Sequence, residues 1–248
     1  MTSNEMWENV LVTYDALFSQ SAPGYEDPES SIILNKAIWY YILQRMNPRS
    51  NRIMAGFEET EFRIQELAPL VEDSNNAADP PTTTGVSQAA ALPGEVLWAL
   101  PSNFMLAIYE GVTTDVPVCG TSTYKRIPVV TISHDEYNLN YSNPYRGPYC
   151  NGTEGVVWRL ENKPQIVNLV ERKIHGIITK DFSVTNYSLR YLRFPTSVVV
   201  DFTTPSNQVN CDLPVIAHQG IVDIAVKLLS AAVRDNIPIN QLTAEVLE

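Results

Sequence analysis

The sequence predicts an α+β protein with a helical N-terminal region, an antiparallel β-sandwich or barrel-like domain, and a C-terminal helix packed back on the helical region. Three patterns support this: apolar residues at helical spacing near the N-terminus, short β-branched segments in the middle, and a long amphipathic stretch near the C-terminus. The 248 residues therefore divide into a helical region at 1–72, a linker or extended arm at 73–91, a β domain at 92–204 and a C-terminal helical segment at 205–248.

Two long helices are expected first. Residues 4–18 carry one continuous apolar face. The second helix, 28–46, starts after Asp27, a favourable N-cap that is followed by proline, and it stops before Pro48. Apolar side chains cover more than half of its circumference, so it is either buried between layers or in contact with another subunit. Its candidate interface residues are Trp39, Tyr40 and Leu43.

A third helix is expected at 53–67. Its inner side is expected to carry the apolar residues Phe57, Ile64, Leu67 and Val71. Its outer side is expected to carry the charged residues Glu58, Glu59, Glu61, Arg63 and Glu66. The polar segment that follows, 73–91, contains consecutive prolines and no large apolar residue, which is typical of an exposed loop or an extended arm.

From residue 92 onward the pattern changes to short strands bounded by proline, glycine and polar residues. Strands of this length and spacing indicate an antiparallel sandwich or barrel. The expected strands are 105–112, 127–133, 155–160, 166–170 and 174–178.

A strand, a turn and a helix follow as one module. Apolar and polar residues alternate over Tyr187–Leu192, and Val198–Val200 resumes the strand after a proline. Asp212 is expected to cap a helix whose apolar stripe runs from Ile216 to Ala232. The strand and the helix each need a packing partner, which the rest of the chain supplies.

Residues 135–153 are expected to form a long loop rich in tyrosine, asparagine and proline. Tyrosine-rich loops are common both in binding surfaces and in interfaces. At its start, His134, Asp135 and Glu136 bring an imidazole and two carboxylates together in sequence. A turn at the end of a strand explains this cluster better than a metal site, because consecutive strand residues point to opposite faces. The candidate interface residues of the loop are Tyr137, Tyr141, Tyr145 and Tyr149.

Composition narrows the functional classes. A net charge of −11 argues against a surface that grips nucleic acid by its phosphates, although an acidic wall would let DNA slide past. The three cysteines and three histidines are dispersed, so no metal site is expected. The sequence contains no phosphate-binding, dinucleotide-binding or serine-nucleophile motif, and we expect no catalytic residue and no cofactor. No secretory signal and no membrane-spanning run is visible.

Short motifs occur in a definite order along most of the chain. Near the C-terminus, Tyr191–Pro195 reads Tyr-Leu-Arg-Phe-Pro and precedes Leu213–Pro214 and the helical segment Ile221–Val226. The earlier motifs are Leu34–Ala37, Arg45–Pro48, Phe57–Glu58, Leu70–Val71, Leu100–Phe104 and Asn143–Tyr145. In this order they resemble the head–tail connector or tail ring proteins of crAss-like tailed bacteriophages.

The resemblance implies a structural virion protein of the phage head–tail junction or tail that is made in the host bacterial cytoplasm and is not an enzyme. It implies a homo-oligomeric ring of about twelve copies below the portal, around a channel through which DNA passes without specific binding. The implied partners are further copies, the portal protein and other tail or connector proteins, with no membrane. Ring closure needs two different patches on each subunit, and the candidates are the helix 28–46 and the aromatic loop 137–149.

Three alternatives stay open at the level of sequence. The loop 135–153 would serve a glycan-binding or protein-binding module. The sequence is also consistent with another phage tail or capsid-associated structural protein. A hydrolase that uses His134 and Asp135 is the remaining hypothesis. The oligomeric state of the purified protein separates the first of these from a ring protein.

Overall fold

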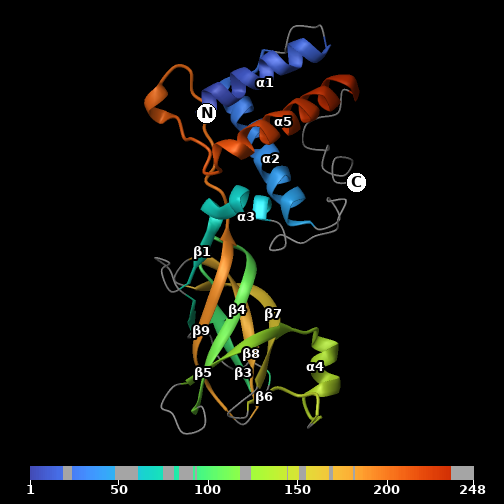
Figure 1. The fold of residues 1–248 in the computed structure, drawn as a ribbon, viewed down its shortest axis with the longest axis vertical. Helices are drawn as coiled ribbons and strands as arrows, with labels where there is room; N and C mark the ends of the chain where they lie inside the picture. Colours follow the sequence, from blue (N-terminus) through green and yellow to red (C-terminus); the bar gives the residue numbers. More distant parts are fainter. Residues whose placement is uncertain are drawn as a thin grey trace. The chain divides into compact units, whose positions relative to one another are not determined.

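The computed structural model describes residues 1–18, 24–47, 61–74, 81–83, 92, 94–117, 124–143, 145–150, 155–167, 170–180 and 182–235. The chain forms two compact units. The helical unit consists of Met1–Leu70 and Pro195–Glu248, and the β unit consists of Val71–Phe194 (Figure 1). The α+β prediction is confirmed.

Within the described residues, the helical unit is built from three long helices: α1 (Ser3–Phe18), α2 (Asp27–Met46) and α5 (Val215–Asp235). Helix α5 packs against both α1 and α2, so the C-terminal helix returns to the helical region as expected (Figure 1). Its buried stripe begins at Ala217, because Ile216 is 57% exposed and lies outside it, contrary to the sequence expectation. The short elements of the unit are α3 (Glu61–Leu67), η2 (Ala68–Leu70) and η4 (Pro205–Asn207).

Helix α2 starts with a capping box instead of the expected Asp27 cap. Glu26 is the N-cap, and its backbone N–H donates to the carboxylate of Glu29 at 3.2 Å. Asp27 lies in the first turn, where its carboxylate accepts a hydrogen bond from the backbone N–H of Phe202 at 3.2 Å. The prediction of Asp27 as N-cap was therefore wrong, because the two glutamates satisfy this helix end and Asp27 holds a distant loop.

The expected faces of the third helix are only partly confirmed in the described part, α3, where Leu67 is buried and Glu61 is exposed as expected. Ile64 is 39% exposed, whereas Arg63 and Glu66 are buried. Glu66 forms an ion pair with Arg45 at 2.7 Å, and Arg63 donates to the carbonyls of Arg45 and Asn47 at 2.9 and 3.4 Å. Periodicity misassigned Arg63 and Glu66 because charged side chains can be buried when they are paired. The N-terminal half of the expected helix lies outside the described residues.

The described strands of the β unit form a nine-stranded sheet in the order β1-β9-β4-β5-β7-β8-β3-β2, with β6 paired to β7. Its neighbours are antiparallel except for the parallel pair of β5 and β7. The sheet curls into a half-barrel (Figure 1). The strands are β1 (Val71–Asp73), β2 (Thr82–Thr83), β3 (Glu95–Ala99), β4 (Phe104–Pro117), β5 (Tyr124–Thr131), β6 (Tyr149–Cys150), β7 (Gly155–Val167), β8 (Val170–Ile178) and β9 (Val184–Arg193).

Aromatic and branched side chains fill the main core of the β unit. Trp98 and Tyr187 lie with their ring centroids 5.8 Å apart, and Phe104 and Tyr191 lie 5.7 Å apart. The strand predicted at Tyr187–Leu192 is confirmed by β9, which places Tyr187, Leu189 and Tyr191 in this core. The alternation itself is incomplete, because Ser188 and Leu192 on the other face are buried too.

The expected second strand of the C-terminal module, Val198–Val200, is not a regular strand. It forms one bridge, between Val199 and Val209. Side chains of α2 satisfy its backbone: Asn35 bonds both the N–H and the carbonyl of Val198 at 2.8 Å, and the Ser31 hydroxyl accepts from the N–H of Val200 at 2.9 Å. The β-branched run is therefore held in an extended form by a helix.

Helix α4 (His134–Asn140) replaces the first part of the expected loop 135–153. Ser133 is its N-cap and accepts from the backbone N–H of Glu136 at 3.2 Å, while the Glu136 carboxylate accepts from the Ser133 N–H at 3.0 Å. The assignment of residues 135–140 to a loop was wrong, because this capping box starts a helix.

Candidate functional site

Strand β4 is paired on both sides over only part of its length. It pairs with β9 almost throughout, but it pairs with β5 only from Gly111 to Pro117. Beyond Pro128, β5 leaves β4 and pairs in parallel with β7. Proline has no N–H to continue a ladder, which explains the departure. The second edge of residues 104–110 therefore has no strand partner among the described residues, and we call the gap between this edge and strands β7 and β8 the β4 seam.

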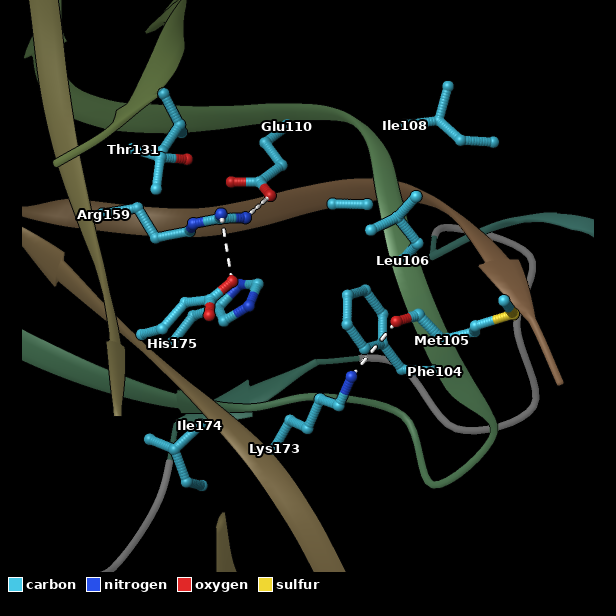
Figure 2. Close-up of a pocket in the computed structure, with 13 residues that line it drawn as sticks. Phe104, Met105, Leu106, Ile108, Glu110, Thr131, Arg159, Lys173, Ile174 and His175 are labelled. Atoms are coloured by element: carbon cyan, nitrogen blue, oxygen red, sulfur yellow. Dashed lines mark hydrogen bonds and ion pairs between the residues drawn. The ribbon is translucent and has the colours of Figure 1, made fainter. Parts of the chain in front are cut away.

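A cavity of about 460 Å³ follows the β4 seam (Figure 2). Five consecutive residues of β4, 104–108, line it. Consecutive side chains of a strand point to opposite faces, so the main chain itself must form part of this wall. Strands β5, β7 and β8 line the cavity as well, through Val129, Thr131, Arg159, Glu161, Lys173, Ile174 and His175.

Two irregularities mark this part of β4. Met105 and Ile108 have no partner in the register with β9, so β4 is bulged at both positions. The ammonium of Lys173 donates to the carbonyl of Met105 at 3.1 Å and lies 5.3 Å from the ring centroid of Phe104. Figure 2 shows this lysine reaching from β8 to β4, so a side chain bridges one end of the seam.

A buried ion pair bridges the other end of the seam. The Arg159 guanidinium of β7 contacts the carboxylate of Glu110 on β4, and the two side chains are only 10% and 9% exposed. The carboxylate of Glu161 lies 3.5 Å from Arg159 and is 73% exposed. The Nε atom of Arg159 is buried and makes no hydrogen bond with the described residues.

Burial controls the protonation of the cavity lining. It raises the pKa of Glu110, against the opposing effect of Arg159. It lowers the pKa of His175 to about 3, and the positive charges of Arg159 and Lys173 act in the same direction. His175 is therefore neutral near pH 7, with Nδ1 3.0 Å from the hydroxyl of Tyr187. The cavity then carries two positive and two negative side chains, without a net charge that selects an ion.

The described residues hold no group of three histidine, cysteine, aspartate or glutamate side chains that could bind a metal. His134, Asp135 and Glu136 occupy the first turn of α4, where Glu136 serves the capping box. No helix in the described ranges is long and apolar enough to span a membrane.

Sequence reasoning did not identify Glu110 and Arg159, although each is a lone charge within an apolar strand segment.

The four candidate tyrosines do not form one surface. Tyr137 is buried against Trp158, and its ring centroid lies 4.9 Å from that of Tyr141. These two tyrosines hold α4 against the sheet. Tyr145 is 94% exposed and Tyr149 is 42% exposed, so they are the accessible members of the set.

The candidate residues of α2 lie at a second cavity. It has a volume of about 450 Å³ and is lined by Ile32, Asn35, Lys36, Trp39, Tyr40 and Ser197. We call it the α2 groove. Ile32 is 53% exposed and Trp39 is 38% exposed, whereas Tyr40 is buried behind them. Leu43 is partly buried and does not line the groove.

Two comparisons with known proteins agree with each other. A family model described as phage tail ring protein 3/4 matches residues 1–238. A protein of Bacteroides phage crAss001 named ring protein 4/5 is 25% identical over 249 residues, which covers 96% of this chain and 95% of that protein.

Proposed function

Because the chain belongs to the phage tail ring protein 3/4 family and is thus a structural protein of the phage tail, we propose that about twelve copies close into a ring below the portal, around the DNA channel. The observation that carries this proposal is the family match over residues 1–238, which includes both units. The portal protein and other tail or connector proteins are the proposed neighbours, and assembly takes place after synthesis in the host cytoplasm. Membership of a structural family favours a role without catalysis.

The distribution of charge supports a place beside DNA. The helical unit contains 16 acidic and 7 basic residues, a net charge of −9, whereas the β unit with 12 acidic and 10 basic residues carries −2. Helix α1 contains no lysine or arginine, and Glu5, Glu8 and Asp15 are exposed on it. Such a surface repels phosphates. We therefore assign the DNA-facing role to the helical unit.

Ring closure requires a contact between two different patches of adjacent copies. The α2 groove is one candidate, with Trp39 accessible and Tyr40 buried in its lining, while Leu43 is partly buried on the same helix. The lobe around α4 is the other, with Tyr145 and Tyr149 accessible. Tyr137 and Tyr141 support that lobe from the core side. Apolar aromatic anchors of this kind dominate many protein interfaces.

Electron microscopy of the purified full-length chain, alone and mixed with the portal of the same phage, tests the proposal. We expect ring-shaped particles with a central channel that stack on one face of the portal. A chain that remains monomeric in both samples would refute the proposed assembly. Particles that bind the portal without a channel would refute the position around DNA while leaving the tail role intact.

A further inference from the structure

We propose that α4 of a neighbouring copy of this chain docks in the α2 groove, with the carboxylate of Asp135 at the ammonium of Lys36 and with Leu139 against the apolar wall. The inference rests on the proposed ring, because the ring places a second copy beside the first. It assigns the two patches of ring closure to each other and names the side chains that set their register.

The α2 groove combines an apolar wall with a cation. Its exposed apolar side chains are Ile32 and Trp39, which lie one turn before and one turn after Lys36 on α2. Among the described residues that line the groove, Lys36 is the charged one. The amide of Asn35 beside it holds the wall in place, because it bonds the N–H and the carbonyl of Val198 at 2.8 Å. An occupant that matches this wall brings an anionic group and an apolar side chain one turn apart.

The outer face of α4 carries these two groups at that spacing. Asp135 and Leu139 are four residues apart, so they lie on the same face of the helix, opposite the buried Tyr137. Leu139 is 78% exposed, so its side chain is available for contact. The exposed carboxylate of Asp135 makes no hydrogen bond or ion pair with the described residues, whereas Glu136 is engaged in the capping box.

The charges of the two units favour α4 over α1 as the occupant. Helix α1 also presents an acid and an apolar residue one turn apart, Glu8 and Val12. It belongs to the helical unit, however, and a contact between two helical units brings together two bodies that each carry a net charge of −9. Helix α4 belongs to the β unit, with a net charge of −2, so it meets less repulsion at the same groove.

The proposed contact joins different units of adjacent copies. Helix α2 lies in the helical unit and α4 lies in the β unit, so each copy offers its groove to one neighbour and its α4 to the other. This is the heterologous arrangement that closes a ring. The opposite charges of Lys36 and Asp135 select the register, and Leu139 supplies apolar contact beside Trp39.

Charge exchange tests the proposal in the full-length chain. Lys36→Glu and Asp135→Lys each bring like charges together, so each should raise the midpoint concentration of ring formation about tenfold or more. The double variant restores an opposite pair with reversed polarity, so its midpoint should return to within about threefold of the wild-type value. Mass photometry over a concentration series measures all three variants.

The matched control is Lys227→Glu, because Lys227 is exposed on α5 and does not line the groove. Alone it should leave the midpoint unchanged, and combined with Asp135→Lys it should restore nothing. Single variants that assemble like the wild type, or a double variant that assembles no better than folded single variants, would overturn the α4 contact while leaving the proposed ring standing. A wild-type chain that forms no ring would overturn both.

Photo-crosslinking tests the same contact without a change of charge. Leu139 is replaced by p-benzoylphenylalanine, and Val130, which is 45% exposed on β5 of the same unit, is replaced in the same way as the control. The rings are irradiated alone and in the presence of the portal. We expect the Leu139 variant to yield dimers whose crosslink maps by mass spectrometry to α2 of a second copy, at about ten times the yield of the Val130 variant, because every closed contact would contain the probe. Equal yields, a crosslink to another part of the second copy, or a crosslink to the portal alone would overturn the proposal.

Discussion

Arg159 of β7 forms a buried ion pair with Glu110 of β4, and this contact joins the two sides of the β4 seam where no described strand pairing does so. The two side chains come from positions 49 residues apart in the sequence. Removing water from two charges is costly unless both remain paired. The stability of the β unit should therefore depend on this pair being complete.

Truncation of one partner should destabilise the protein strongly. Glu110→Ala leaves the Arg159 guanidinium buried without its main acceptor, and we expect a loss of about 3 kcal/mol in the free energy of unfolding. Urea denaturation measures this loss. The matched control is Glu161→Ala, because Glu161 also faces Arg159 but is 73% exposed, and we expect a change below about 0.5 kcal/mol. Equal effects at the two positions would show that burial does not set the strength of the pair.

Acid should weaken the β unit through His175. Its folded pKa is lowered to about 3 from an ordinary value of 6.5, so the unfolded chain binds the extra proton between these values. The contribution of His175 to the free energy of unfolding is fully present above pH 6.5. It declines as the pH falls towards 3, by at most about 1.4 kcal/mol per pH unit.

The variant His175→Asn isolates this effect. Asparagine can still hydrogen-bond to Tyr187 but does not titrate. The raised pKa of Glu110 acts in the opposite direction, since its folded form retains a proton more readily, but it is present in both proteins. The difference between their unfolding free energies, measured by urea denaturation from pH 7 to pH 4, should therefore shrink or reverse as the pH falls. Parallel curves would contradict the buried neutral histidine.

Gly94 is predicted to be intolerant of any side chain. Its φ of +76° lies in the left-handed region, and a Cβ would lie 2.2 Å from the carbonyl oxygen of Thr179 and 2.7 Å from the hydroxyl of Tyr141. Gly94→Ala should lower the free energy of unfolding by about 2 kcal/mol or more. Gly24→Ala is the control, because nothing lies within 4 Å of the position that a Cβ would take there. Thermal unfolding of both variants checks the difference.

The α2 groove should contribute to assembly rather than to folding. Trp39→Ser removes an accessible aromatic ring, and we expect weaker ring formation, with the midpoint concentration rising about tenfold or more. Phe62→Ser is the control, since Phe62 is 53% exposed on α3 and does not line the groove. Mass photometry over a concentration series compares the two. Ring formation that is equally affected by both substitutions would exclude a specific role for Trp39.

Local patterns were sufficient to predict much of the fold. The apolar stripes of α1, α2 and α5 and the alternation of β9 each follow from side chains that neighbour one another along the element. The burial of Arg63 and Glu66 on α3 could not be found in this way, because their partners lie at the distant end of α2. Likewise, Val198–Val200 has strand composition, but the side chains of Asn35 and Ser31 supply the hydrogen bonds of Val198 and Val200.

The candidate site was harder to predict than the fold. Tyr137 and Tyr145 look equivalent in the sequence, yet one is buried between α4 and the sheet and the other is 94% exposed. The β4 seam depends on where β5 leaves β4, and Pro128 alone does not reveal that the edge of a second strand is left without a described partner there. Such features arise from pairing between segments far apart in the chain, which no local spacing encodes.

Native mass spectrometry of the purified full-length chain tests the central claim most directly. The proposed assembly predicts one discrete closed species of about twelve copies, with no ladder of larger forms, because a heterologous contact that closes satisfies every patch. A chain that stays monomeric at every concentration, or one that grows into an open series of sizes, would contradict it.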